Sequence, residues 1–99
     1  MRFKQRYYTQ RELDQAGDRI PSLAARFAAK EAVSKALGTG MGVVRPADME
    51  VVQDENRAPH LHLHGEALRV ADSLGLKTWS ISLSHSDQYA VAFVVAVGE

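Results

Sequence analysis

The stretch Ala25–Gly42, A-R-F-A-A-K-E-A-V-S-K-A-L-G-T-G-M-G, predicts the element on which the rest of the chain packs. The segment Leu23–Leu37 contains neither glycine nor proline, is rich in alanine, and repeats apolar residues at helical spacing. Ser22 is placed to cap the start of a helix, and Gly38 is typical of the residue that ends one. We therefore expect a long central helix over Leu23–Leu37 with one side facing the core.

Four charged residues lie on this largely apolar helix: Arg26, Lys30, Glu31 and Lys35. Lys30 follows Arg26 by one helical turn and Lys35 follows Glu31 in the same way, so each pair shares a side of the helix. On spacing alone, the favoured interpretation is a solvated face with a Glu–Lys pair worth roughly 0.2–0.5 kcal/mol. The functional alternative is a phosphate or pyrophosphate clamp, in which the carboxylate holds a hard divalent cation and the lysines neutralise the oxygens.

The composition fits one small domain spanning residues 1–99, with 45% apolar and 24% charged residues. The formal net charge is zero, which gives no general attraction to nucleic acid or to an anionic membrane. The longest apolar run, Tyr89–Val97, is too short to span a bilayer. The chain has no cysteine, and its N-terminus lacks the apolar core of a signal peptide. We expect a cytoplasmic protein that binds neither nucleic acid nor membrane.

The rest of the chain alternates between helix and hairpin signals. Thr9 and Glu12 form a capping-box pattern before a short helix. Two pairs of β-rich segments, each pair with a turn between its members, predict antiparallel hairpins. The expected elements are a helix at 10–16, a loop at 18–22, strands at 49–53 and 59–64 about a turn at 54–58, a helix at 65–74, and strands at 79–85 and 89–97 about a turn at 86–88. This order predicts an α+β fold in which an antiparallel sheet packs on the long central helix.

Two further motifs each have a structural and a functional explanation. The glycine-rich segment Gly38–Gly42 follows its helix, whereas a phosphate loop precedes one, so a helix end leading into a loop is the default. His60, His62 and His64 alternate on a predicted strand, and three imidazoles on one face could bind zinc or nickel. A polar face of an edge hairpin is the favoured interpretation, because no cysteine or carboxylate completes the set.

The segment Ser84-His85-Ser86 ends a predicted strand and is followed by Asp87. Neighbouring residues on a strand point to opposite faces, so Ser84 and His85 would not meet as the nucleophile and base of a hydrolase. The pattern favours a histidine that binds an anion or orients a neighbouring group.

Taken together, A-R-F-A-A-K-E-A-V-S-K-A-L-G-T-G and the later S-I-S-L-S-H-S-D-Q-Y-A-V-A-F-V resemble the 4′-phosphopantetheinyl transferases, and among them the small holo-acyl-carrier-protein synthases. R-Y-Y-T-x-x-E at Arg6–Glu12 and D-M-E-V at Asp48–Val51 resemble further motifs of this family, so the resemblance covers nearly the whole chain. It implies transfer of 4′-phosphopantetheine from coenzyme A to a serine of apo acyl carrier protein, with release of 3′,5′-ADP, in lipid metabolism such as fatty acid biosynthesis.

The resemblance assigns catalytic roles on the central helix. It implies that Glu31 is a Mg²⁺ ligand and the candidate base for the incoming serine hydroxyl. Lys35 is implied to contact the pyrophosphate as charge develops on the leaving group. Lys30 is implied to be a second cation near the coenzyme A phosphates, and Arg26 a further candidate for binding coenzyme A.

The resemblance also assigns a binding role to the distant strand end. His85, with Ser84 and Ser86, is implied to hold phosphate oxygens of coenzyme A. The family's Asn-Gly-x-Pro hairpin turn, which helps to bind the nucleotide, corresponds to N-R-A-P at 56–59. Arg57 replaces the glycine, and we expect this to change the turn.

Members of this family open with a strand of the form G-[IT]-D-[IL]-[VI]-E, whose Asp is the other carboxylate on the metal. The printed sequence starts directly before the R-Y-Y-T motif. These 99 residues are therefore expected to be N-terminally short, with Glu31 as the one family carboxylate at the metal and one strand fewer in the sheet.

The family forms homotrimers with coenzyme A bound between subunits, and we expect the same here. The leading hypothesis is a phosphopantetheinyl transferase. The alternatives are a catalytically incomplete module that binds coenzyme A or a carrier protein, and an accessory subunit with the same fold.

Overall fold

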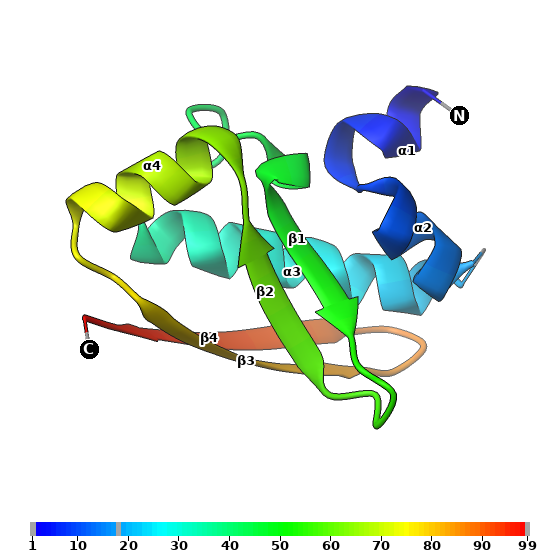
Figure 1. The fold of residues 1–99 in the computed structure, drawn as a ribbon. Helices are drawn as coiled ribbons and strands as arrows, with labels where there is room; N and C mark the ends of the chain where they lie inside the picture. The colour runs from blue at the N-terminus through cyan, green and yellow to red at the C-terminus, as the bar shows by residue number, and fades with distance from the viewer. Residues whose placement is uncertain (1, 18, 99) are drawn as a thin grey trace.

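The chain folds into helices and two β-hairpins arranged around one long helix (Figure 1). The computed structural model describes residues 2–17 and 19–98. In chain order the elements are α1 (Arg2–Tyr7), α2 (Gln10–Ala16), α3 (Ile20–Ala36), the 3₁₀ turn η1 (Pro46–Asp48), β1 (Met49–Gln53), β2 (Pro59–Leu63), α4 (Gly65–Ser73), β3 (Thr78–His85) and β4 (Ala90–Val97). No helix in this described part of the chain is both long and apolar enough to cross a membrane.

The long helix α3 starts earlier than the sequence predicts. It begins at Ile20 rather than Leu23, and Arg19 rather than Ser22 occupies the cap position. The predicted start was wrong because Pro21 lies within the first turn, where its missing N–H breaks no helical hydrogen bond and its fixed φ suits the helix. The predicted loop at 18–22 is therefore largely helical, and its residue 18 lies outside the described residues. The expected stop at Gly38 is confirmed by a left-handed φ of 77°.

The strands form two separate antiparallel hairpins rather than one sheet. β1 pairs with β2, with Val51 opposite Leu61, and β3 pairs with β4, with Ile81 opposite Val94. Figure 1 shows β1–β2 running across the direction of β3–β4, which prevents β2 and β3 from forming a ladder. The predicted α+β class is confirmed, but the described strands do not make the single sheet that we expected.

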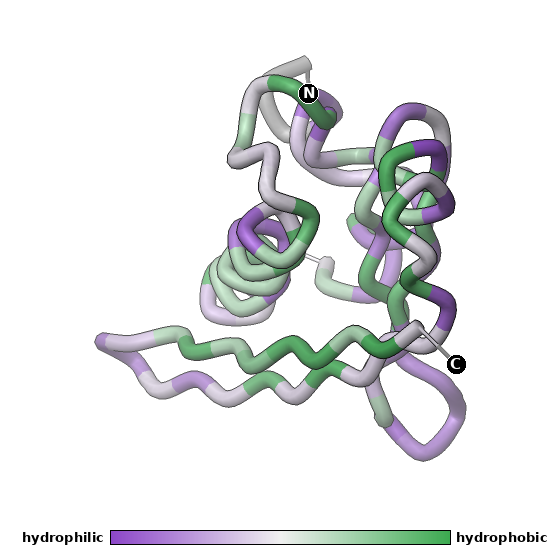
Figure 2. Tube along the Cα trace, turned by 90° about the vertical axis from the view of Figure 1, so that its left-hand side faces the viewer, coloured by the Kyte–Doolittle hydropathy of each residue, from purple (hydrophilic) through white to green (hydrophobic). Residues whose placement is uncertain are grey.

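The core lies where α3 meets both hairpins and α4. Its buried members are Val33, Leu37, Val44, Met49, Ala67 and Ala71. On the hairpin β3–β4, alternate residues such as Trp79 and Val94 pack toward this cluster. The other face of β4 is exposed although it is apolar: Phe93 is 70% and Val95 60% accessible. Figure 2 shows β4 as an almost continuous hydrophobic strand below α3. β4 therefore has one covered face and one open face.

The outer edge of β1 pairs with side chains instead of with another strand. The carboxylate of Glu12 on α2 accepts the N–H of Val51 at 2.9 Å through Oε2. The amide of Gln15 accepts the N–H of Gln53 at 2.9 Å and donates to its C=O at 3.0 Å. α2 therefore supplies the hydrogen bonds that a neighbouring strand would supply.

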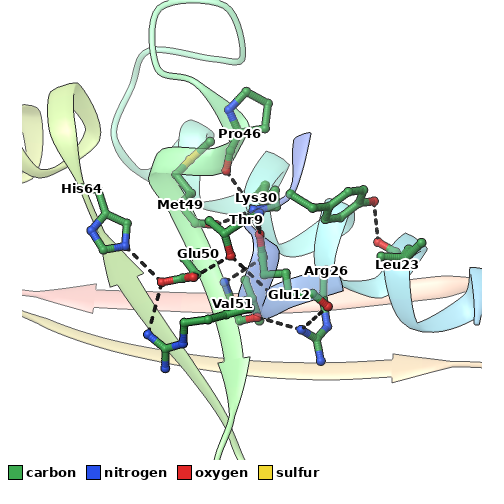
Figure 3. Close-up of polar contacts among 12 residues, drawn as sticks. Thr9, Glu12, Leu23, Arg26, Lys30, Pro46, Met49, Glu50, Val51 and His64 are labelled. Atoms are coloured by element: carbon green, nitrogen blue, oxygen red, sulfur yellow. Dashed lines mark hydrogen bonds and ion pairs between the residues drawn. The ribbon is translucent and has the colours of Figure 1, made fainter. Parts of the chain in front are cut away.

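Helix α3 completes the same edge from the other direction (Figure 3). Arg26 donates through Nη1 to the C=O of Val51 at 3.0 Å, and Lys30 donates through Nζ to the C=O of Met49 at 2.8 Å. The N–H of Met49 bonds to the C=O of Pro46. Every backbone polar group on this edge therefore has a partner, as burial of a strand edge requires.

Glu12 and Lys30 form a fully buried ion pair at the centre of this contact. Their Oε1 and Nζ atoms are 2.9 Å apart, and both side chains are 0% exposed. Glu12 Oε1 also accepts the N–H of Thr9 at 2.9 Å, which confirms the predicted capping box. Burial lowers the pKa of Lys30 by more than the carboxylate of Glu12 raises it. Burial, together with the charge of Glu12, raises the pKa of Tyr8, whose ring lies 5.6 Å from Lys30 Nζ, to about 12.

Removing one member of the pair should be far more damaging than removing an exposed lysine from the same helix. We expect Lys30→Met to lower the free energy of unfolding by about 3–5 kcal/mol, because it leaves the carboxylate of Glu12 buried without a counter-charge. Lys35→Met, at an exposed site on α3, should change it by less than about 0.5 kcal/mol. Urea denaturation followed by circular dichroism measures both.

The double variant Glu12→Gln/Lys30→Met shows how much of the effect comes from the ion pair itself. It leaves no unpaired charge buried, so its loss of unfolding free energy should be clearly smaller than the sum of the losses for Glu12→Gln and Lys30→Met alone. Equal losses for Lys30→Met and Lys35→Met would show that the buried pair does not hold α2, α3 and β1 together.

Candidate functional site

Glu31 and Lys35 lie one turn apart on the exposed side of α3. Neither side chain has a hydrogen bond or ion pair with another residue in the described ranges. Below them, Ser34 is buried and donates to the C=O of Glu31 at 2.7 Å, so the backbone under the pair is well fixed. The helix therefore exposes one carboxylate and one ammonium, one turn apart, and neither group is engaged with another described side chain.

Lys30 lies on the opposite, inner side of α3 and does not reach the surface. Its Nζ donates to Oε1 of Glu12 at 2.9 Å, and to the C=O groups of Pro46 and Met49 at 2.8 Å each. An ammonium has three donors, so none is left for a phosphate. The predicted contact between Lys30 and coenzyme A is therefore corrected: Lys30 fastens α3 to β1.

Arg26 is also buried, at 1% exposure, but it retains an unused donor. Its Nη1 bonds to the C=O of Val51 and, at 3.3 Å, to Oε1 of Gln15. Its Nη2 has no hydrogen-bond partner among the described residues. Burial lowers the pKa of Arg26, and the carboxylate of Glu12 opposes this shift. A buried donor without a partner costs stability, and an anion close to Nη2 would remove that cost.

A polar cavity of about 440 Å³ lies where the N-terminal end of α3 meets the ends of both hairpins. His85 contributes to it from the end of β3, Arg57 from the turn between β1 and β2, and Arg19 from the start of α3. The remaining lining residues are Gln15, Ser22 and Gln53. The lining holds two arginines, a histidine and no carboxylate, and the positive end of the α3 dipole points the same way. This arrangement suits an anion.

The two serines beside His85 do not line the polar cavity. Ser84 lies on the exposed face of β3, while Leu83 and His85 point to the other side. The hydroxyl of Ser86 accepts the N–H groups of Gln88 at 3.2 Å and Tyr89 at 3.1 Å, so it closes the turn between β3 and β4. Of the three predicted residues, His85 alone lines the polar cavity.

One chain does not bring the predicted site residues together. Glu31 and Lys35 are separated from Ser22, at the polar cavity, by about 14–20 Å along α3, at 1.5 Å per residue. The predicted residues therefore fall in two separate places: the Glu31–Lys35 pair in one half of α3, and His85 at the polar cavity near the other end.

Two of the three alternating histidines make contacts with acids: His60 on β2, and His64, which directly follows this strand. His60 Nε2 lies 2.9 Å from Oδ2 of Asp54, and His64 Nε2 lies 3.0 Å from Oε1 of Glu50. Burial alone would raise the pKa of Glu50, but hydrogen bonds from Thr9 and His64 and the charge of Arg11 lower it. The described residues contain no group of three or more histidines or acids placed to hold a metal ion.

Sequence reasoning did not predict that Arg19, Gln15 and Arg57 line one polar cavity. Gln15 and Arg19 carry no motif, and they reach the cavity because α2 ends next to the start of α3. Arg57 did carry a signal, since it stands where the resembled motif has glycine. It adopts a φ of 64°, in the left-handed region that favours glycine, so an arginine forms this turn.

Comparison with known proteins shows the family of this chain. A family model described as the 4′-phosphopantetheinyl transferase superfamily matches residues 1–94. A holo-[acyl-carrier-protein] synthase of Herpetosiphon aurantiacus is 47% identical over 98% of this chain and 82% of its own length. One of Dehalococcoides mccartyi is 47% identical over 96% of this chain and 79% of its own length.

Solved structures give the same result for the fold. The Helicobacter pylori holo-[acyl-carrier-protein] synthase in complex with coenzyme A has a TM-score of 0.86 and 33% identity, covering 98% of this chain and 83% of that one. The Bacillus anthracis synthase in complex with CoA (3′,5′-ADP) has a TM-score of 0.76 and 39% identity, covering 96% and 79%. This chain therefore belongs to the 4′-phosphopantetheinyl transferase superfamily.

Proposed function

We propose that this chain is a holo-acyl-carrier-protein synthase, which transfers 4′-phosphopantetheine from coenzyme A to a serine of apo acyl carrier protein. The observation that carries the proposal is the uncommitted Glu31–Lys35 pair on α3, in a chain that shares its fold with a synthase solved in complex with coenzyme A. The buried residues of the same motif hold α3 in place, so the exposed pair has a fixed position.

The reaction needs a base that takes the proton of the serine hydroxyl, and a cation close to the oxygen of the leaving group. The serine hydroxyl attacks the pyrophosphate phosphorus that carries the pantetheine, and its proton passes to the carboxylate of Glu31. The bond from that phosphorus to the bridging oxygen breaks, and 3′,5′-ADP leaves. Lys35, one turn along α3, neutralises the negative charge that grows on this leaving group.

The donor set on this face suits Mg²⁺ as the metal of the site. Mg²⁺ in enzymes that act on phosphates is commonly held by one or two carboxylates together with phosphate oxygens and water. Glu31 supplies one exposed carboxylate without a described partner. When bound, the ion supplies charge neutralisation for the pyrophosphate.

The polar cavity is the proposed site for another phosphate of coenzyme A. His85 and Arg19 line it, and Arg26 lies behind Gln15 with an unused donor. Because this cavity and the Glu31–Lys35 pair lie at opposite ends of α3, we assign them to two neighbouring subunits that share one coenzyme A.

We accordingly propose a homotrimer, and the exposed side of β4 is its candidate contact surface. Val91, Phe93, Val95 and Val97 are 46%, 70%, 60% and 47% exposed, which is unusual for an apolar strand of a monomer. A second copy of this chain would cover them and bring the two parts of the site together. We also propose that the protein works in the cytoplasm and serves fatty acid biosynthesis, which is consistent with its lack of cysteine.

Glu31→Gln tests the assigned base. We expect it to reduce transfer by at least about a hundredfold, because an amide cannot accept the serine proton. The free energy of unfolding should change by less than about 0.5 kcal/mol, since the side chain is exposed. The assay incubates apo acyl carrier protein, coenzyme A and Mg²⁺ with the protein and measures the added phosphopantetheine mass.

Asp72→Asn on α4 is the control, because it also removes an exposed carboxylate. Unchanged transfer by Glu31→Gln would remove Glu31 from its role. If the unaltered chain binds coenzyme A but transfers nothing, it is instead a catalytically incomplete binding module.

Phe93→Glu tests the contact surface. A charge at this exposed apolar site should convert the trimer to monomers, because its burial between subunits would leave it unpaired. Transfer should fall with the trimer, since each site needs two chains. Size-exclusion chromatography with light scattering measures the mass. Leu74→Glu, at the exposed leucine that directly follows α4, should leave the trimer intact; dissociation by Leu74→Glu alone would place the contact at this end of α4.

A further inference from the structure

Arg57 holds a backbone conformation that an arginine rarely adopts. It has a φ of 64°, and among the described residues it is the non-glycine residue with a positive φ. Its N–H donates to the C=O of Asp54, and the N–H of Asp54 donates to the C=O of Ala58, both at 2.9 Å, so the turn is well formed. A side chain in this region is strained, and glycine would form the same turn without that strain. Strain of this kind is a reason to look for a function of the side chain.

The side chain of Arg57 lines the polar cavity together with Arg19 and His85. The nearest acid of the turn, Asp54, is already engaged, because its Oδ2 lies 2.9 Å from His60 Nε2 and its Oδ1 accepts the N–H groups of Asn56 and Ala58. Glu55, the other acid of the turn, is exposed and does not line the cavity. The guanidinium of Arg57 is therefore available to a ligand in the cavity.

We propose that Arg57 is a specificity-determining residue that binds the phosphate on the ribose of coenzyme A, and so makes the protein prefer coenzyme A to dephospho-coenzyme A. This inference rests on the proposed function, which assigns the pyrophosphate to Glu31 and Lys35. The remaining phosphate is a monoester that carries a charge of about −1.5 to −2 at pH 7. Guanidinium groups bind such phosphates with two parallel hydrogen bonds.

Arg57→Gly separates binding from folding, because the two effects have opposite signs. We expect the dissociation constant for adenosine 3′,5′-bisphosphate to rise about tenfold, as for the loss of one charge-assisted contact. The constant for adenosine 5′-phosphate should stay within about twofold, because the phosphate in question is absent from it. The midpoint of thermal unfolding should stay the same or rise, since glycine relieves the turn. Isothermal titration calorimetry at fixed ionic strength measures the binding.

Two further variants serve as controls. Arg57→Lys keeps the charge and the strained backbone but loses the paired donors, so its affinity should be intermediate. Arg69→Gln removes one arginine charge from the exposed surface of α4 and should leave both constants unchanged. Equal weakening of both nucleotides by Arg57→Gly, no weakening of either, or no binding of the bisphosphate by the unaltered chain would each overturn the proposal.

The transfer assay distinguishes this inference from the proposed function. If transfer proceeds but the ratio of KM for dephospho-coenzyme A to KM for coenzyme A is the same in Arg57→Gly and the unaltered chain, Arg57 has no such role and the function stands. If no transfer occurs but the bisphosphate still binds in a manner that depends on Arg57, the proposed function fails and the assignment of Arg57 stands.

Discussion

The outer edge of β1 needs hydrogen-bond partners, and this requirement organises much of the molecule. The edge lies inside the protein, where unpaired N–H and C=O groups are costly. Glu12 and Gln15 from α2 and Arg26 and Lys30 from α3 supply the partners. Because these side chains must converge on one strand, they fix the position of both helices. The buried charge of Lys30 is tolerated because Glu12 and two carbonyl groups surround it.

The same requirement explains how adjacent residues of one motif take opposite roles. Lys30 and Glu31 are neighbours in sequence, but neighbours on a helix point in directions about 100° apart. Lys30 therefore points inward to β1, while Glu31 remains on the surface one turn before Lys35. The inner residue sets the rotation of α3 about its axis, and this rotation determines where the Glu31–Lys35 pair points. A site on a helix held in this way is more precise than one on a loop.

Local signals in the sequence predicted most elements, because capping, periodicity and turn residues act over a few positions. The capping box at Thr9 and the stop at Gly38 are examples. The start of α3 was misplaced because Pro21 suits both a loop and a first helical turn. Lys30 was misassigned because burial depends on β1, a contact that helical spacing cannot reveal. The polar cavity could not be predicted at all, since it unites residues from α2, α3 and both hairpins that come together only in the fold.

The covering of β1 also affects how copies of this chain meet one another. A strand edge whose backbone groups are already paired cannot accept a strand from another molecule, so β1 is protected from the edge-to-edge growth that leads to fibrils. β4 has a pairing partner in β3 on one side, and its apolar outer face is open. Unwanted adhesion between copies would therefore start at the open face of β4 rather than at the edge of β1.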